Sequence, residues 1–309
     1  MCRPTYYTIA YEINPWMRLT RQVDRRAAIR QWQALYTLLT TRLKVPVRLI
    51  RPVPGLPDLV FTANAGLVVG RTFIRSNFRY PERHGEEPVF ERYFRERGYR
   101  IARLPRPFNF EGEGDALWMG ERLLLGFRFR SDATAHERVA SILRLEVLPL
   151  ELVDRRFYHL DTCLCPLDAE TALWFPRAFD RYGRKVIETY VKDPVAVSEA
   201  DAARFCCNAI VVGKTLVLHR GVSGGLRRQL RKRGVALREL DLSEFLKAGG
   251  SAKCLALRLA TERMAGEKSD QLPCEESPLV KQTLEGALDD WKRRRSVTLK
   301  DYLRGKRSP

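Results

Sequence analysis

The sequence predicts an α/β fold in which about five strand-strand-helix-strand units close into a five-bladed propeller. Three observations predict this architecture. One interval of 46 to 51 residues recurs along the chain, hairpin glycines occupy matching positions within the intervals, and helical patterns lie between the hairpins. An open α/β sheet, in which the regular spacing arises by chance, is the alternative architecture.

Polar or reactive side chains mark the recurring interval, and each of them opens a short apolar run. Successive marks are separated by 51, 46, 47 and 46 residues. The marks are Asn64, Asp115, Asp161, Asn208 and Cys254. A repeat of this length is typical of equivalent strands that surround a common axis. We therefore expect the five marks to meet near that axis and to form an active site there.

Hairpins are predicted inside the repeated units, because paired apolar runs flank short turns. Three copies cover residues 64–74, 115–127 and 208–219, and a looser copy covers residues 161–179 and turns at 168–170. The turns of the first three are Gly70-Arg71, Gly120-Glu121 and Gly213-Lys214. Glycine tolerates the positive φ that such two-residue turns require.

Helices are predicted where apolar and charged residues alternate at roughly helical spacing. These stretches are residues 25–43, 88–97, 131–143 and 198–205. The first seven residues lack the hydrophobic segment of a signal peptide and are expected to form a strand.

Composition favours one large catalytic domain over residues 1–264, since 45% of the 309 residues are hydrophobic. Residues 265–309 depart from the repeat and are expected to form a basic appendage, with a helix over 284–303 and a possible role in homo-oligomer contacts. No apolar run is long enough to span a membrane. Seven cysteines without a signal sequence indicate reduced thiols in a cytoplasmic protein.

The net charge of +18 raises the question of nucleic-acid binding. The arginines are spread along the whole chain, however, and no nucleic-acid recognition motif accompanies them. We therefore expect no specific nucleic-acid partner, although a scaffold that binds polyanions remains the alternative in which the protein is not an enzyme.

A candidate nucleophile, Cys254, follows the glycine-rich bend that begins at Gly249. A lone cysteine at the start of a strand is more often a core residue than a catalytic one. The other marks favour catalysis, because His159 and Asp161 are two residues apart and are expected on one strand face. Further carboxylates occur at Glu111, Glu113 and Asp115, and the segment from Asp58 to Asn64 adds an acid, the aromatic Phe61 and an amide.

Several carboxylates with one thiol and one imidazole suit a planar cation that carries many N–H donors. A guanidinium has five such donors in a fixed fork. Carboxylates would hold it, a thiolate would attack its central carbon, and histidine would protonate the leaving amine and then activate water. A metal site is the competing interpretation, but no CxxC pair is present, so we expect no metal or other cofactor.

These motifs together resemble those of the pentein superfamily of guanidine-modifying enzymes. It contains arginine deiminases, dimethylarginine dimethylaminohydrolases, amidinotransferases and arginine dihydrolases. The resemblance covers residues 1–264 and rests on four motifs. They are the Asp58–Asn64 segment, Glu111-Gly-x-Gly-Asp115, His159-x-Asp161 and the Gly-Gly-x-x-x-Cys254 bend.

The resemblance implies Cys254 as the nucleophile and His159 as the general acid and base. It implies that Glu111 and Asp161 hold the guanidinium and orient the histidine. The remaining expected substrate-binding residues are Asp58 for distal nitrogens or the α-amino end, Phe61 against the substrate stem, Asn64, Asp115, and Arg130 with Arg83 for an α-carboxylate. The Glu111-Gly-x-Gly-Asp115 motif has one residue more than the corresponding motif of the deiminases, so Glu113 remains an alternative to Glu111.

Asn64 stands where deiminases and dimethylargininases carry an aspartate. An amide both donates and accepts, so it could retain a ureido product that a carboxylate would repel. The segment at 61–65 and that at 11–17 resemble arginine dihydrolases. The expected reaction is arginine to ornithine, two ammonia and carbon dioxide through a thiouronium intermediate; the alternatives are a one-step dimethylargininase or deiminase that yields citrulline, and an amidinotransferase.

Overall fold

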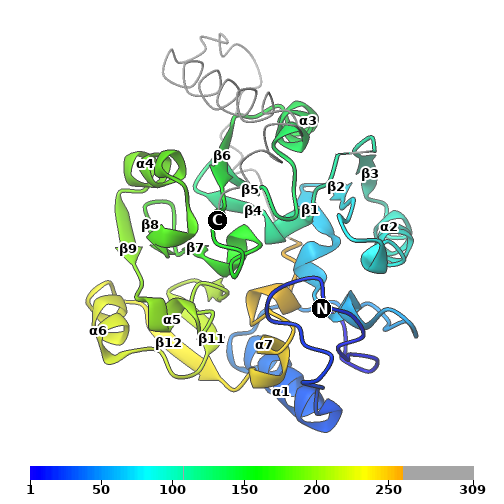
Figure 1. The fold of residues 1–309 in the computed structure, drawn as a ribbon, viewed down its shortest axis with the longest axis horizontal. Helices are drawn as coiled ribbons and strands as arrows, with labels where there is room; N and C mark the ends of the chain where they lie inside the picture. The colour runs from blue at the N-terminus through cyan, green and yellow to red at the C-terminus, as the bar shows by residue number, and fades with distance from the viewer. Residues whose placement is uncertain (107, 260–309) are drawn as a thin grey trace, which may run out of the picture. The chain divides into compact units, whose positions relative to one another are not determined.

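The structure, a computed structural model, describes residues 1–106 and 108–259 of the chain. Four three-stranded sheets follow one another along it, and each repeats the same connectivity (Figure 1). The first strand pairs antiparallel with the second, and a helix then returns the chain to a third strand parallel to the second. This is an α/β fold of repeated ββαβ units.

The sheets and their helices have the following bounds. The first contains β1 (Gly66–Val69), β2 (Thr72–Arg75), α2 (Glu86–Arg95) and β3 (Arg100–Arg103). The second contains β4 (Ala116–Met119), β5 (Arg122–Phe127), α3 (Ala133–Leu143) and β6 (Val147–Glu151). The third contains β7 (Leu164–Pro166), β8 (Thr171–Trp174), α4 (Arg181–Tyr190) and β9 (Asp193–Ala196). The fourth contains β10 (Ile210–Val212), β11 (Thr215–His219), α6 (Gly224–Lys232) and β12 (Ala236–Leu240).

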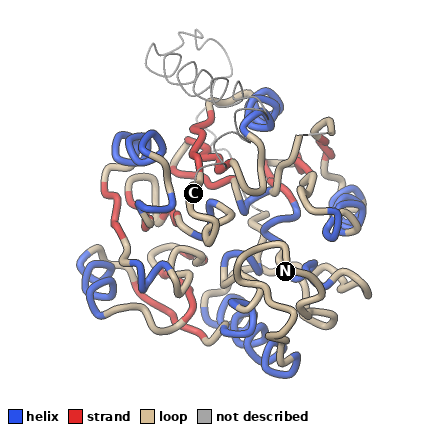
Figure 2. Tube along the Cα trace, in the orientation of Figure 1, coloured by secondary structure: helices blue, strands red, loops and turns tan. Residues whose placement is uncertain are grey.

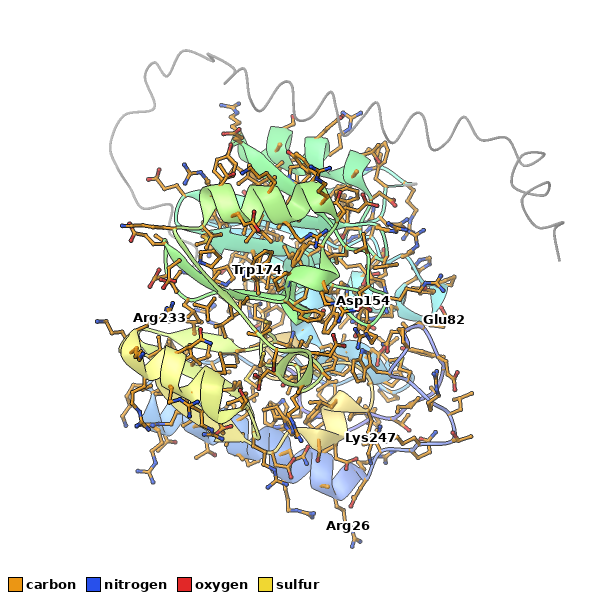
Figure 3. All side chains as sticks on the ribbon, turned by 60° about the vertical axis from the view of Figure 1, so that its left-hand side comes forward. Arg26, Glu82, Asp154, Trp174, Arg233 and Lys247 are labelled. Carbon is orange, nitrogen blue, oxygen red and sulfur yellow. The ribbon has the colours of Figure 1, made fainter. Side chains whose placement is uncertain are left out.

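Helices cover the outer side of the sheets, and Figure 2 shows them at the periphery with the strands nearer the middle. In the first unit, Phe94 of α2 stacks on Phe73 of β2 with ring centroids 3.8 Å apart. Trp174 lies inside the protein, whereas Arg26 projects from α1 (Arg25–Thr37) at the surface (Figure 3). Apolar side chains such as Phe94 therefore bury the inner faces of these helices, while helix arginines such as Arg26 remain exposed.

The predicted hairpins are confirmed in all four units. Gly70, Gly120 and Gly213 adopt φ values of +54°, +59° and +54° between the paired strands. The looser copy also forms a hairpin, in which the Asp168 carboxylate accepts the backbone N–H groups of Glu170 and Thr171. Glycine at the left-handed positions lets these two-residue turns form without a Cβ clash.

The predicted helices are confirmed in part. α1 continues into a π-helical turn at Leu38–Arg42, and α2 and α3 match their predicted stretches within two residues at each end. The stretch at 198–205 forms only the four-residue α5 (Glu199–Ala202). Sequence patterning missed α4 and α6. Each of these helices contains glycine and many charged residues, which weaken the helical pattern. The helices are stabilised by burial of a few apolar side chains and by the N-cap residues Asp180 and Ser223.

Two strand predictions are wrong. The first seven residues form no strand and make a single bridge, between Cys2 and Ile50. The five marks also do not begin strands. Four of them lie in or directly beside short 3₁₀ turns, which are η3 (Thr62–Ala65), η5 (Gly112–Gly114), η6 (Leu160–Thr162) and η8 (Lys253–Leu255).

The predicted domain boundary after residue 264 and the predicted helix at 284–303 lie outside the described residues. Among the residues that the structure describes, no helix has the length and apolar character needed to cross a membrane.

Candidate active site

The five marks of the repeat meet, as the sequence predicts. The turn η3 contacts both η5 and η8, and η5 contacts η6. Asn208 connects the remaining turns, since its amide donates to the Asp161 carbonyl and to the Cys254 thiol. Equivalent turns from successive units therefore place their side chains around one site.

A small cavity opens at this site. Six of the predicted site residues line it: Asp58, Phe61, Asn64, Arg83, Arg130 and Cys254. The rest of the lining comes from Ile13, Asn14, Met17, Tyr158, Ala248 and Gly250. The sequence predicted only a resemblance to arginine dihydrolases over residues 11–17 and no site residue there. Ile13, Asn14 and Met17 are therefore site residues that the sequence analysis missed.

The Cys254 side chain is buried, with 2% of its surface exposed. Its Sγ lies 3.5 Å from Asp161 Oδ2, to which the thiol donates, and 3.1 Å from Asn208 Nδ2. Burial raises the pKa of the Cys254 thiol well above its usual value, and the Asp161 carboxylate raises it further. The unliganded site therefore favours a protonated thiol, and a cation in the cavity would favour the thiolate.

His159 and Glu111 form a buried pair in which the imidazole Nε2 lies 2.8 Å from Glu111 Oε2. Arg130 donates to the same oxygen at 2.9 Å. Burial opposes ionisation of Glu111, but the charges of Arg130 and His159 outweigh it and hold the pKa of Glu111 below its usual range. Glu113 faces elsewhere and pairs with the Lys253 ammonium at 2.7 Å. Of the two glutamates, it is Glu111 that contacts the histidine.

His159 and Asp161 do not share a strand face, so that prediction is wrong. His159 has extended backbone angles, and the η6 turn that follows points Asp161 toward Cys254. The predicted contact of Asp161 with the histidine is thus replaced by one with the thiol. Burial raises the pKa of Asp161 to about 7, although the Lys253 ammonium opposes the shift.

Asn64 has a fixed amide orientation. Arg83 donates from Nη1 to Asn64 Oδ1 at 2.9 Å, and a guanidinium cannot accept, so the amide nitrogen must point away from it. Two bonds of 2.8 Å from Arg83 to Glu86 hold the guanidinium in turn. The buried Nδ2 of Asn64 has no hydrogen-bond partner within the described chain. Both N–H donors of this nitrogen are therefore unused, and Asn64 lines the cavity.

The other two predicted acids differ in their surroundings. Asp58 is buried beside the Tyr11 hydroxyl, its Oδ1 has no hydrogen-bond partner in the described chain, and burial raises its pKa despite the nearby Arg83. Asp115 accepts from the Ser131 hydroxyl at 2.6 Å and from the Leu160 N–H at 3.0 Å. Burial raises the pKa of Asp115 to about 6. Both of its oxygens are occupied, so Asp115 holds the η6 turn.

We predict that Gly114→Ala inactivates the protein without unfolding it. A Cβ at this position would lie 2.4 Å from Asn64 Nδ2 and 3.1 Å from two atoms of the His159 ring. Displacing these two groups by about 1 Å should lower kcat on the order of 100-fold. The matched control is Gly213→Ala, where φ is +54° and nothing lies within 4 Å of the added methyl. It should lose about 1 kcal/mol of stability and no activity. The reverse pattern would contradict the geometry.

Comparison with known proteins places these residues in a family. Residues 9–260 match the family described as eukaryotic N,N dimethylarginine dimethylhydrolase. The bifunctional arginine dihydrolase/ornithine cyclodeaminase AgrE of Nostoc is 45% identical over 264 residues, which are 84% of this chain and 37% of AgrE. The N(G),N(G)-dimethylarginine dimethylaminohydrolase of Mycobacterium tuberculosis is 42% identical over 259 residues, 84% of both chains.

Solved structures agree with this placement. The N-terminal domain of ArgZ, in an asparagine-to-serine variant covalently bound to a reaction intermediate, is 43% identical to this chain and has a TM-score of 0.80. The match covers 84% of this chain and 96% of that domain. The chain spans less than half the length of AgrE, since the match covers 37% of that protein. On this fold and this match, the chain belongs to the dimethylarginine dimethylhydrolase family of guanidine-modifying enzymes.

Proposed function

We propose that the protein is an arginine dihydrolase that converts arginine and two water molecules to ornithine, two ammonia and carbon dioxide. The observation that carries this proposal is the orientation of Asn64, whose unused amide donor lies at a cavity wall that also includes Cys254. The 45% identity to AgrE, which carries an arginine dihydrolase activity, supports it.

The first half of the reaction replaces one nitrogen of the substrate by oxygen. The Cys254 sulfur bonds to the guanidinium carbon, one terminal C–N bond breaks, and the thiol proton leaves with ammonia through His159. Water, deprotonated by His159, then adds to the thiouronium carbon, and the C–S bond breaks. The ureido compound and the free thiol result, and the Glu111 carboxylate beside His159 stabilises the charged imidazolium.

The second half removes the remaining terminal nitrogen. A guanidinium offers only donors, whereas the ureido carbonyl accepts hydrogen bonds. Asn64 Nδ2 would donate to this carbonyl and hold it beside Cys254, which attacks again and releases the second ammonia. Water then releases a carbamic acid, which loses carbon dioxide to leave ornithine.

Charged groups at the cavity would bind the amino-acid end of the substrate. Arg130 is the proposed partner of the α-carboxylate, and Asp58, with an unpaired buried oxygen, is the proposed partner of the α-amino group or distal nitrogens. Arg83 serves in this proposal mainly to orient Asn64, because its guanidinium donates to the Asn64 amide oxygen. Phe61 would pack against the aliphatic stem.

A second candidate is hydrolysis of dimethylated arginine to citrulline. The relative from Mycobacterium tuberculosis favours it, because the match covers 84% of both chains. The catalytic residues would be the same, and the difference would lie in the substituents accepted and in whether the ureido group is released.

The test is product identification after incubation of the purified protein with arginine. Ornithine with two equivalents of ammonia is the expected result. Citrulline with one equivalent would overturn the two-step reaction, and turnover of dimethylarginine alone would establish the second candidate. Glycine added to the assay should yield no amidinated product, since formation of one would indicate an amidinotransferase.

We predict that arginine binds more tightly as the pH rises toward 7. The pKa of Asp161 is raised to about 7, so the free protein holds a proton there at lower pH. A guanidinium favours the carboxylate, and binding must therefore expel this proton. Affinity should fall by up to about tenfold per pH unit below 7 and level off above 8.

This pH dependence can be measured by calorimetry with the Cys254→Ser variant, in buffers of different ionisation enthalpy. The additional substitution Asp161→Asn should remove the proton release. An affinity that is constant from pH 5.5 to 8 would contradict the proposed contact of Asp161 with the substrate.

We also propose that a fifth blade completes a five-bladed propeller. Its parts would come from both ends of the described chain, since Cys2 bridges Ile50 in parallel and Ile50 packs in one apolar cluster with Leu257 and Leu259. The contact of η8 with η3 supports this closure.

A further inference from the structure

Asn208 is a fully buried asparagine whose amide is saturated by contacts with the cysteine bend. Its Oδ1 accepts the backbone N–H groups of Ser251 at 2.9 Å and Cys254 at 3.2 Å. Its Nδ2 donates to the Asp161 carbonyl at 3.2 Å and to Cys254 Sγ at 3.1 Å. None of its surface is exposed, and every hydrogen-bonding position that an amide has is in use.

We propose that Asn208 is a further catalytic residue, which fixes the bend that carries Cys254 and stabilises the thiolate by donating to its sulfur. The proposal rests on the proposed role of Cys254 as the nucleophile. It does not depend on whether the product is ornithine or citrulline.

The amide orientation cannot reverse. Backbone N–H groups only donate, so the two that face Asn208 fix its oxygen toward the bend. The nitrogen must then face the Asp161 carbonyl and the sulfur, both of which accept. An N–H donor therefore already faces Sγ before negative charge develops on the sulfur. Preorganised donors of this kind accelerate a reaction because they need no rearrangement.

A neutral donor suits this substrate. Thiolates are often stabilised by a neighbouring cation, but a cation at the sulfur would repel the positively charged guanidinium. The nearby ammonium of Lys253 is instead paired with Glu113 at 2.7 Å. An amide N–H stabilises the thiolate and adds no positive charge to the cavity.

The titratable groups that influence Cys254 are Asp161, Lys253 and Tyr158. Asp161 disfavours the thiolate, and Lys253 and the Asn208 amide favour it. Asn208→Ala leaves the three titratable groups in place and adds none, so a change in the ionisation of the thiol in that variant can be assigned to the lost donor. Asn208→Asp also places a carboxylate beside the sulfur, whose negative charge would raise the thiol pKa further.

The experiment compares wild type with Asn208→Asp and Asn208→Ala. The aspartate keeps an acceptor for the two N–H groups but replaces the donor by an oxygen, and the alanine removes the donor under all conditions. The rate of Cys254 modification by iodoacetamide is measured against pH, with the modified peptide identified by mass spectrometry. No turnover is required, so an inactive wild type would reject the proposed function and leave this measurement valid.

We expect the midpoint of Cys254 modification to move up by about one pH unit or more, which slows modification about tenfold at a fixed lower pH. With arginine, kcat should fall on the order of 100-fold while KM changes less than about threefold. An aspartate that stays protonated could still donate, in which case the alanine variant alone shows the shift. If every folded variant keeps the wild-type midpoint, the proposal is overturned.

The matched control is Asn77→Asp. Asn77 is also buried, and its amide donates to the carbonyls of Leu104 and Phe108 rather than to a residue of the cavity. This variant should lose stability and keep the wild-type pH profile of Cys254. A shift as large as that of Asn208→Asp would show that the profile reports general loosening, and would also overturn the proposal.

Discussion

Cys254→Ser is expected to abolish ammonia release from arginine, with a loss on the order of 10⁴-fold or more. A serine hydroxyl ionises far less readily than a thiol, and within the part of the chain described here no basic side chain is hydrogen-bonded to Cys254 Sγ. The acceptor beside it is Asp161, and a carboxylate that binds the substrate guanidinium, as proposed above, is not free to take the hydroxyl proton. Ammonia release is measured in a coupled assay, and thermal stabilisation by arginine shows that the variant still binds substrate.

The matched control for this substitution is Cys165→Ser. Cys165 is another buried cysteine, and its Sγ faces the Ala209 carbonyl, which can accept from a serine hydroxyl. Full activity is expected for this variant. Substantial ammonia release by Cys254→Ser would rule out a covalent intermediate on this residue, and loss of activity in both variants would indicate a general effect of losing a buried thiol.

The repeat predicted the location of the site because equal spacing along the sequence identifies equivalent positions in successive units. Five polar marks at similar spacing had to fall at equivalent places if the units were alike, and their turns do contact one another. Hairpins could be predicted for a related reason. A two-residue turn requires a residue at positive φ, and the glycine that meets this requirement is visible in the local sequence.

Side-chain directions at the site could not be predicted in the same way. A strand would place His159 and Asp161 on one face, whereas the η6 turn separates them toward Glu111 and Cys254. The choice of a 3₁₀ turn depends on contacts distant in sequence, such as the Leu160 N–H bonded to the Asp115 carboxylate. Local pattern carries no information about such contacts.

The role of Asn208 could not be predicted from its place in the repeat. It lies on the period, yet its amide side chain suggested no chemistry of its own. Its role follows from four hydrogen bonds that reach residues 43 to 47 positions away. The helices α4 and α6 were missed for a similar reason, because tertiary packing of a few side chains outweighs weak local propensity there.

Asn64→Asp should change the main product from ornithine to citrulline. Arg83 would hold one carboxylate oxygen as it now holds the amide oxygen, and the second oxygen would replace Nδ2 at the cavity wall. A carboxylate binds the guanidinium of arginine well, so the first hydrolysis should persist. It cannot donate to the ureido carbonyl and repels it, which favours release over a second attack.

The loss of one hydrogen bond together with this repulsion amounts to about 2–3 kcal/mol, so the ratio of ornithine to citrulline should fall on the order of 100-fold. Ammonia per arginine consumed should decrease from two toward one, as measured by chromatography of the products with an ammonia assay. Asn77→Asp, which adds the same charge at a residue that does not line the cavity, should leave the ratio unchanged. If Asn64→Asp still yields ornithine with two ammonia, the donor at this position does not retain the ureido group. The two-step specificity must then arise from faster attack by Cys254 rather than from slower release of the intermediate.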